Sequence, residues 1–134
     1  VDENISSLSA ILLDDAYYNL FLQGIRTVDG VSVLDTEYIV PFKAKAYLDL
    51  KARREAGENV DSRKVKKHKR DALRLAQLLG ESAGVNLAEE LKDDMLAFVK
   101  DCEASDINLK QIGVVGVTMI QLLETMKATY GLIG

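Results

Sequence analysis

The sequence predicts one domain of the α+β class, mainly α, in which a short N-terminal β segment precedes about four to five helices. The length of 134 residues is close to that of one ordinary domain. With 48% hydrophobic and 28% charged residues, the composition is globular rather than disordered. Strand-like alternation and a hairpin-turn dipeptide occur only within residues 1–35, whereas residues 36–134 have helical spacing.

All of the β structure is expected in the first 35 residues. The run ISSLSAILL, Ile5 to Leu13, alternates in part and favours a strand. The Asp14-Asp15 pair closes this strand and caps a short helix over Ala16 to Gln23. From Ile25 to Asp35, β-branched residues flank Asp29-Gly30, a dipeptide typical of two-residue hairpin turns. This part therefore predicts a strand, a helix and a hairpin.

Two basic helices are expected next. Pro41 suits the first turn of a helix, where its missing N–H needs no partner, and good helix formers follow from Phe42 to Ala56 until Gly57. The second helix is predicted from Asp61, as N-cap, to Leu79, with Gly80 as its stop. Its predicted apolar face consists of Val65, Ala72, Leu75, Ala76 and Leu79.

A third helix is predicted from Leu87 to Ala104. Asn86 and Glu89 have the spacing of a capping box at its start. The apolar stripe that faces the core consists of Leu91, Met95, Phe98, Val99 and Cys102. On this stripe, Cys102 is expected to be a buried thiol rather than a reactive one.

The last helix is predicted from Val117 to Tyr130. Thr118 and Gln121 form a second candidate capping box, and Gly131 follows the helix as a C-terminal stop. The glycines of GVVG, Gly113 to Gly116, lack the spacing of a dinucleotide-binding loop and predict only a loop before this helix. Its predicted core-facing residues are Met119, Leu122, Leu123, Met126 and Tyr130.

Composition excludes several classes of protein. The longest stretch without charge, Gln111 to Leu123, is shorter than the ~20 residues that cross a bilayer, so no membrane partner is expected. The N-terminus lacks the pattern of a secretory signal. The single cysteine, Cys102, excludes an internal disulfide and fits a cytoplasmic location. The single histidine, His68, argues against a transition-metal site and is expected at the edge of the core.

Charge is distributed unevenly along the chain. Residues 43–74 contain twelve Lys and Arg against five Asp and Glu, although the whole chain has a net charge of −4. Such clustering favours a phosphate or polyanion site in this segment. A pair of solvated, salt-bridged helices would have the same composition, so both interpretations stay open.

Four residues of this segment are candidates for ligand binding: Lys43, Lys67, Arg70 and Asp71. Lys43 is a candidate because its neighbour Lys45 can pair with the residue one turn later, which leaves Lys43 freer to meet an anion. Asp71 lies one turn from Lys67 inside a basic stripe, and we interpret it as the group that orients a cation toward phosphate. The alternative is an ion-pair ladder that has no ligand.

Motifs for catalysis are missing from the sequence. It has no P-loop, no H-E-x-x-H and no G-x-S-x-G. Adjacent carboxylates occur at Asp14-Asp15, Glu89-Glu90 and Asp93-Asp94, but neighbours on a helix point about 100° apart and are expected to be solvated rather than to share a metal. We therefore predict neither catalytic residues nor metal ligands in this chain.

The basic segment resembles a known protein family. EYIVPFKAKAYLDLKARREAGENVDSRKVKKHKRDALRLAQLL is similar to the C-terminal part of bacterial nucleotidyltransferase-like proteins of the AbiEii/AbiGii toxin family, and SSLSAILLDDAYY and GVTMIQLLETMKATYG resemble flanking parts. Lys43 with Ala46 matches the family's K-x-x-A motif. Arg70, Asp71 and Leu75 match its R-D-x-x-x-L motif, although Arg74 stands where many relatives have a second Asp.

The resemblance implies a DNA-polymerase-β-like nucleotidyltransferase fold, of which the β segment supplies the last strands. In that fold a G-S-x-x-x-D motif and strand carboxylates hold the divalent metals, and the downstream Lys and Asp help to seat the nucleoside triphosphate. Lys43, Lys67, Arg70 and Asp71 are then nucleotide-binding residues. Because the chain lacks the G-S motif, the bound nucleoside triphosphate with Mg²⁺, and any transferase activity, are expected only together with a missing N-terminal part.

The implied partners are the nucleotide, that N-terminal part of the same protein and an antitoxin protein. Two rival functions stay open: a small helical module that binds RNA or DNA through the basic segment, and a protein-interaction domain. Only Phe42 and Tyr47 accompany the basic segment as aromatic residues, which is few for stacking on single strands. Whether Val1 is a true start or a cut site would distinguish these functions.

Overall fold

The computed structural model describes residues 8–80 and 84–132, which form helices and one two-stranded antiparallel hairpin. In chain order the elements are α2 (Asp15–Gly24), β1 (Ile25–Val28), β2 (Val31–Leu34), α3 (Thr36–Glu55), α4 (Ser62–Ala76), α5 (Glu89–Glu103), the 3₁₀ helix η1 (Leu109–Ile112) and α6 (Met119–Tyr130). The prediction of a mainly helical α+β fold with a short N-terminal β segment is confirmed.

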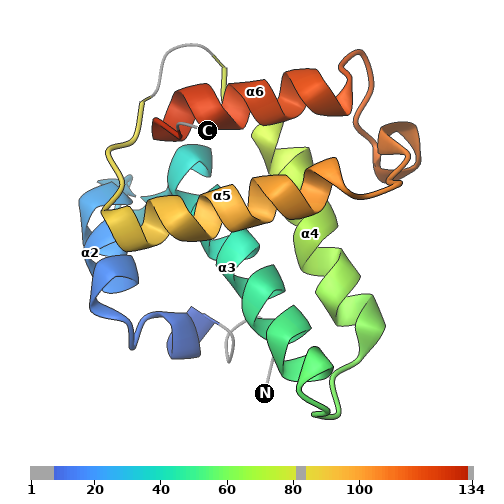
Figure 1. Cartoon of the computed structure of the whole chain (residues 1–134). Helices are drawn as coiled ribbons and strands as arrows, with labels where there is room; N and C mark the ends of the chain where they lie inside the picture. Colours follow the sequence, from blue (N-terminus) through green and yellow to red (C-terminus); the bar gives the residue numbers. More distant parts are fainter. Residues whose placement is uncertain (1–7, 81–83, 133–134) are drawn as a thin grey trace.

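The helices pack around the α3–α4 pair. These two helices lie antiparallel, α5 crosses over both, and α6 runs beside α5 on the side away from the loop of residues 57–61 (Figure 1). α2 packs against α3 and α5. Fully buried side chains from α4, α5 and α6, among them Leu73, Phe98 and Met126, fill the space between these layers. Among the described residues, no helix is both long and apolar enough to span a bilayer.

The strand predicted over Ile5 to Leu13 is wrong where it can be tested. Residues 8–11 are helical, and residues 5–7 lie outside the described part of the chain. Leu8 and Ile11 are three residues apart, a spacing that also suits one face of a helix. Within residues 8–80 and 84–132, no third strand joins the β1–β2 hairpin. The cap predicted at Asp14 is confirmed, because its carboxylate accepts hydrogen bonds from the N–H groups of Ala16 and Tyr17 at 2.9 and 3.3 Å.

The predicted hairpin turn is confirmed. Val28 pairs with Val31, and Asp29 and Gly30 have φ of +50° and +78°, as a type I′ turn requires. Behind the hairpin, Gly24 is needed for packing, since a Cβ there would lie 2.3 Å from the ring of Tyr38. The hairpin is thus held against the start of α3.

Helix α3 begins at Thr36, five residues before the start that was predicted at Pro41. Inside a helix, proline has no N–H for the carbonyl four residues earlier, which here belongs to Glu37. The hydroxyl of Tyr130, a fully buried residue of α6, donates a hydrogen bond of 2.7 Å to that carbonyl. A side chain from the other end of the sequence therefore satisfies the group that Pro41 leaves without a partner.

Helix α4 is shorter than predicted and turned slightly about its axis. The N-cap predicted at Asp61 is confirmed by its hydrogen bond of 2.9 Å from the N–H of Arg63. The helix ends at Ala76 rather than at Leu79. Leu75, predicted on the core face, is only partly buried, whereas Leu73 is fully buried between the helices.

Helix α5 does not have the predicted capping box. Its N-cap is Ala88, which has no side-chain acceptor, and Glu89 is already the first helical residue. Leu87, which was predicted inside the helix, is buried in the core from the extended segment before it. The predicted apolar stripe is confirmed, since every one of its members is buried: Leu91, Met95, Phe98, Val99 and Cys102.

Helix α6 was predicted more closely. The Thr118 side chain accepts from the N–H of Gln121 at 3.1 Å, and the Gln121 side chain accepts from the N–H of Thr118 at 3.0 Å. Gly131 ends the helix in the left-handed conformation, with φ of +63°. The glycines at 113–116 lie in the predicted loop, although η1 just before them was not predicted. Met119 is only partly buried, in contrast to the prediction.

We expect Tyr130→Phe to lower the free energy of unfolding by about 1–3 kcal/mol, because it leaves the buried Glu37 carbonyl without a donor. In a Pro41→Ala background, the new N–H of residue 41 can donate to the Glu37 carbonyl. Tyr130→Phe should therefore lower the free energy of unfolding clearly less in that background. Urea unfolding of the four proteins measures the coupling. Equal costs in both backgrounds would show that the hydroxyl does not compensate for the proline.

Candidate anion-binding site

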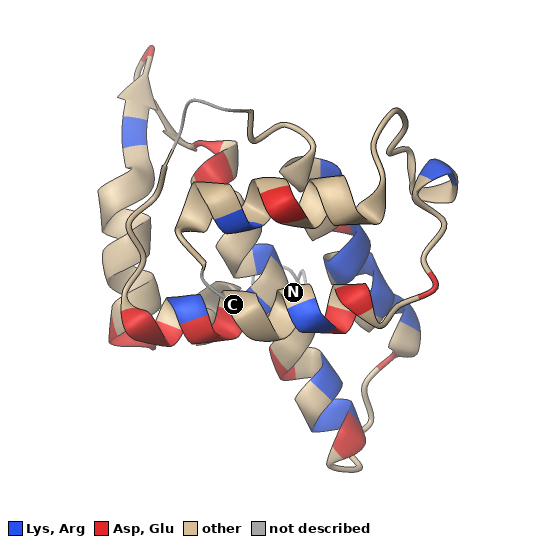
Figure 2. Ribbon diagram, turned by 45° about the horizontal axis from the view of Figure 1, so that its top comes forward, with Lys and Arg blue, Asp and Glu red and all other residues tan. Residues whose placement is uncertain are grey.

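The α3–α4 pair places most cations of the chain on one side of the molecule. The loop of residues 57–61 turns the chain back, so that the basic segment is folded against itself instead of being extended. Figure 2 shows Lys and Arg concentrated on α4 and on the second half of α3. Two separate groups of cations result, one on each flank of α4.

The first group, called here the Lys43 group, consists of Lys43, Asp71 and Arg74. The Lys43 Nζ lies 3.4 Å from an Asp71 carboxylate oxygen, across the interface between α3 and α4. The Arg74 Nη1 lies 2.8 Å from the other oxygen of Asp71, and its Nε donates a 2.7 Å hydrogen bond to the carbonyl of Ile112 in η1. Asp71 therefore orients two cations, one from its own helix and one from the neighbouring helix.

The structure brings two of the four predicted site residues together and separates the others. Lys43 and Asp71 are in contact, so Lys43 is not the free lysine that the sequence suggested. Lys67 is exposed one turn before Asp71. Arg70 lines a different flank of α4 from Asp71, because consecutive helical residues point about 100° apart. In the described part of the chain, neither Lys67 nor Arg70 takes part in an ion pair.

The second group surrounds a cleft of about 420 Å³ between α3, α4 and Ile107. We call it the basic cleft. Five cations line this cleft: Lys51, Arg54, Lys66, Lys69 and Arg70. Arg54, Lys66 and Arg70 form no ion pair within the described residues. Among the described residues, three positive charges at this cleft thus have no carboxylate partner.

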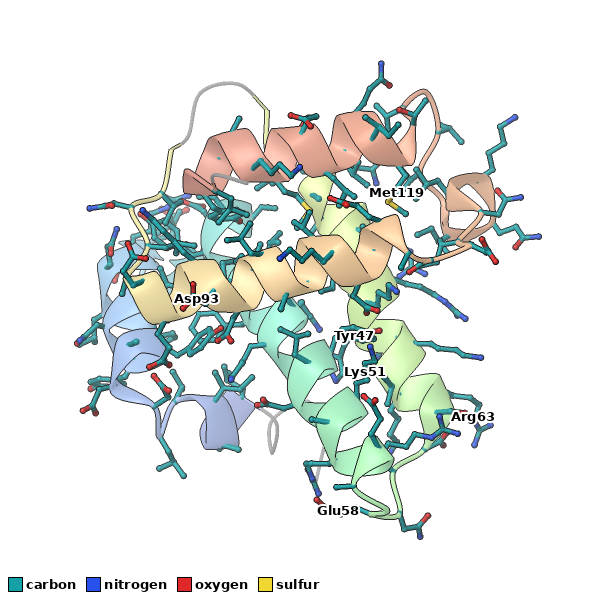
Figure 3. All side chains as sticks on the ribbon, viewed as in Figure 1. Tyr47, Lys51, Glu58, Arg63, Asp93 and Met119 are labelled. Carbon is teal, nitrogen blue, oxygen red and sulfur yellow. The ribbon has the colours of Figure 1, made fainter. Side chains whose placement is uncertain are left out.

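Lys51 and Lys69 share a single carboxylate at the edge of the basic cleft. Their Nζ atoms lie 3.2 and 3.4 Å from the two oxygens of Asp101 on α5. Lys69 is almost fully buried, hydrogen-bonds the Ser105 hydroxyl, and lies 5.2 Å from the centre of the Tyr47 ring. Figure 3 shows Tyr47 and Lys51 between α3 and α4. These two lysines therefore hold α5 on the helix pair.

Burial alone would raise the pKa of Asp101, but the Tyr47 hydroxyl and the two lysines hold it below its ordinary value. Burial, together with the neighbouring Asp101 carboxylate, raises the pKa of Tyr47. At neutral pH, Asp101 is therefore ionised and Tyr47 is protonated. Asp101 therefore neutralises one of the two positive charges of Lys51 and Lys69. The other positive charge remains at the basic cleft.

The carboxylate of Asp94 contacts other side chains, so the expectation that the adjacent carboxylates are solvated is wrong for this residue. One of its oxygens accepts a 2.7 Å hydrogen bond from the hydroxyl of Tyr17 and lies 3.5 Å from the Nζ of Lys45. Lys45 also pairs with Asp49 at 3.3 Å, as its spacing predicted. Asp93, labelled on α5 in Figure 3, is exposed. The two neighbouring carboxylates thus differ because α5 turns only one of them toward α3.

Sequence reasoning missed four members of the basic cleft, namely Lys51, Arg54, Lys66 and Lys69. The spacing partly indicated this grouping, because Lys66 and Arg70 are four residues apart and so share one helix face. Val65 and Lys69 are also four residues apart, and both are buried. Which face of α4 meets α3 depends on tertiary packing. The pattern of charges therefore could not separate the two groups.

The remaining single residues of interest are both buried. Cys102 is fully buried, as predicted, and burial raises the pKa of its thiol to about 12. His68 lies deeper than the core edge at which it was expected, with 3% of its surface exposed. Burial first, and the nearby Lys43 ammonium second, lower the pKa of its imidazole, so that His68 is neutral at pH 7.

Among residues 8–80 and 84–132, no three His, Cys, Asp or Glu side chains lie close enough together to hold a metal ion. Comparisons with protein-family models, curated proteins and solved structures found no match to this chain. Function must therefore be argued from the two groups of cations.

We expect Asp101→Asn to make the protein less stable at neutral pH and less sensitive to acid. Because the folded pKa of Asp101 is lowered, its stabilisation is complete above the unfolded pKa of about 3.9 and is lost as the pH falls through the folded value. The stability difference from wild type should therefore be constant from about pH 7 to 5 and shrink below about pH 4.

Urea unfolding at a series of pH values measures this difference. Asp93→Asn is the matched control, since Asp93 is an exposed aspartate on the same helix. It should follow wild type at every pH. If the stability deficit of Asp101→Asn did not shrink below about pH 4, where the unfolded carboxyl begins to bind its proton, the ion pairs would not be its source.

Proposed function

We propose that this chain is the nucleotide-binding helical half of an AbiEii-like nucleotidyltransferase. The triphosphate lies on the flank of α4 that holds the Lys43 group. Lys43 and Lys67 contact its oxygens, and Asp71 positions the Lys43 ammonium. Arg70 contributes from the basic cleft to the positive potential around the ligand.

The contact between Lys43 and Asp71 supports this proposal most directly. These residues belong to the two short motifs on which the family resemblance rests, and they are 28 positions apart in the sequence. Their side chains are nevertheless 3.4 Å apart and only about a quarter exposed. Residues that serve one ligand from two helices need such a meeting point.

The charges of this group suit a compact anion. Asp71 carries one negative charge and pairs with both Lys43 and Arg74, so one positive charge is left uncompensated. The exposed Lys67, one helical turn before Asp71, adds a second positive charge. Ammonium groups held in place by a carboxylate lose less side-chain entropy when phosphate binds. A short run of phosphates would therefore find a prepared, positively charged surface.

The described residues do not fit the Mg²⁺ that the family resemblance implies. Two-metal nucleotidyl transfer needs carboxylates grouped around the ions, and no such group occurs among the described residues. Metal-dependent transfer would require carboxylates from elsewhere, so we derive no catalytic step for this chain. Its part in the proposed activity is to bind and orient the nucleotide.

The basic cleft favours a second candidate function, which is binding of nucleic acid. Arg54, Lys66 and Arg70 have no carboxylate partner in the described part of the chain, and the cleft between them is open to solvent. Unpaired cations along a groove can follow a phosphate backbone. Tyr47 is the aromatic residue in this cleft, however, and it is largely buried, which gives bases little surface for stacking.

We expect Lys43→Ala to weaken binding of nucleoside triphosphate to the chain by about tenfold or more, as for loss of a hydrogen bond to a charged group. Lys45→Ala is the matched control, because Lys45 lies two residues away on α3 but pairs with Asp49 and Asp94. It should bind as wild type does. Calorimetric titration with ATP, GTP, CTP and UTP in turn measures affinity, and thermal unfolding shows that each variant is folded. Equal affinities of Lys43→Ala and wild type for every nucleotide would refute the proposed site.

For the second function, we expect a 20-nucleotide RNA or DNA to bind weakly and to be released by about 200 mM salt, since only a few phosphates meet the basic cleft. Fluorescence anisotropy over a salt series gives the affinity and its salt dependence. An Arg54→Ala, Lys66→Ala, Arg70→Ala triple variant should abolish the residual binding, and the Lys45→Ala control should retain it. Tight binding that survives this salt concentration would favour the nucleic-acid function over the nucleotide.

A further inference from the structure

The basic cleft collects positive charge from both sides of the α3–α4 interface. Its cations come from two helices, Lys51 and Arg54 from α3 and Lys66, Lys69 and Arg70 from α4. Val65 of α4 and Ile107, which follows α5, are apolar members of its lining. The volume of about 420 Å³ is within the range of about 300–1,000 Å³ that is usual for small-molecule sites. A ligand in this space would meet cations of both helices at once.

Carboxylates compensate only part of this charge. Asp101 pairs with two of the five cations. Burial raises the pKa of Tyr47 most, and the charges of Asp101 and Glu55 add to it, so both carboxylates act at this cleft. Two carboxylates against five cations leave three positive charges uncompensated. The cations without an ion pair in the described part of the chain are Arg54, Lys66 and Arg70. Like charges around one space repel, and an anion bound among them removes this repulsion.

Neutral pairs or acidic groups flank the cleft on two sides. At the loop between α3 and α4, Arg53 pairs with Glu58 at 3.1 Å. Arg63 pairs with Asp61 at 3.0 Å, and the labelled Glu58 and Arg63 both lie at this loop (Figure 3). Where the cleft meets the segment after α5, Asp106 is exposed. A long phosphate backbone that left the cleft on either side would therefore meet neutral pairs or a negative charge, whereas a compact anion would not.

The kind of compact anion follows from the charge and from the side chains. One phosphate group carries at most about two negative charges, fewer than the cleft can compensate. The guanidinium groups of Arg54 and Arg70 suit phosphate, because each can donate two parallel hydrogen bonds to its oxygens. Nucleic acid would gain little from stacking, since Tyr47, the aromatic residue of this cleft, is only 6% exposed. The observations favour a small molecule with several phosphate groups.

We propose that the basic cleft is a second anion site that binds a compact polyphosphate. Arg54, Lys66 and Arg70 contact its phosphates, and the two lysines paired with Asp101 add to the positive potential. Because α3 and α4 both contribute cations, the bound anion links these helices and stabilises the folded protein. The inference does not depend on the function proposed above, which places a nucleotide on a different flank of α4. Inorganic polyphosphate and a phosphorylated small molecule share this chemistry.

Calorimetric titration at about 150 mM salt, a physiological ionic strength, tests the site. The probes are inorganic tripolyphosphate and inositol hexakisphosphate, with orthophosphate and a 20-nucleotide RNA for comparison. At least one of the two polyphosphates should bind about tenfold or more tightly than orthophosphate, and the tighter one identifies the source. Arg54→Ala, Lys66→Ala and Arg70→Ala should each weaken it by about tenfold, as for loss of a hydrogen bond to a charged group. The triple variant should not bind it.

A control variant removes three positive charges from outside the cleft, by Arg53→Ala, Arg63→Ala and Lys110→Ala. Arg53 and Arg63 pair with carboxylates beside the cleft, and Lys110 is exposed on η1. The control has the same net charge as the cleft triple variant, and it should bind the polyphosphate as wild type does. Thermal unfolding shows that both variants are folded, as expected for exposed positions. The polyphosphate should raise the Tm of wild type and of the control, but not that of the cleft triple variant.

Equal loss of binding in both triple variants would show an effect of net charge alone and would overturn the site. Orthophosphate as tight as the polyphosphates, RNA tighter than either, or no binding to wild type would also overturn it. The nucleotide site is tested separately by titrating nucleoside triphosphates into the cleft triple variant, in which the Lys43 group is intact. They should still bind there. Their failure to bind would overturn the proposed function and leave the polyphosphate site standing.

Discussion

The hydrogen bond from Tyr130 to the carbonyl of Glu37 is the constraint on which the rest of the structure depends. It allows α3 to continue through Pro41 as one helix of 20 residues. If α3 began at Pro41, Lys43 would stand in the first turn of a helix, where backbone and side chain are held least firmly. Because the helix starts five residues earlier, Lys43 lies in its regular interior. The same bond attaches α6, from the end of the chain, to the start of α3.

A second constraint is the pairing of α5 carboxylates with cations of the basic helices. Asp94 and Asp101 are seven residues apart and so lie on one face of α5, which is the face turned toward α3. They take up Lys45, Lys51 and Lys69 as structural partners. This pairing divides the basic segment into cations that hold helices together and cations that remain available. The sequence composition alone could not make that division, because both kinds are equally charged.

Several local signals in the sequence were reliable, although the capping box expected at Asn86 and Glu89 was not, and signals that depend on distant residues failed. Asp29-Gly30 and the Thr118 capping box act through neighbouring atoms, so each predicted its turn or helix start. Pro41 was assigned to a helix start because the compensating hydroxyl is 89 positions away at Tyr130. Likewise, Arg70 and Asp71 are adjacent in the sequence but face different flanks of α4, since the neighbouring helices decide its orientation. The structure therefore groups the predicted site residues differently from the sequence, and their assignment to a ligand site stays a prediction.

Arg74 gives the Lys43 group a property that a simple ion pair lacks. If a phosphate drew the ammonium of Lys43 away, as the proposed function requires, Asp71 in an isolated pair would be left as a partly buried carboxylate without compensation, which is costly. Here the Nη1 of Arg74 stays 2.8 Å from Asp71, and its Nε is fixed by the carbonyl of Ile112. Asp71 therefore keeps one cation throughout. In the proposed function, Lys43 would therefore exchange a carboxylate for a phosphate without leaving Asp71 unpaired.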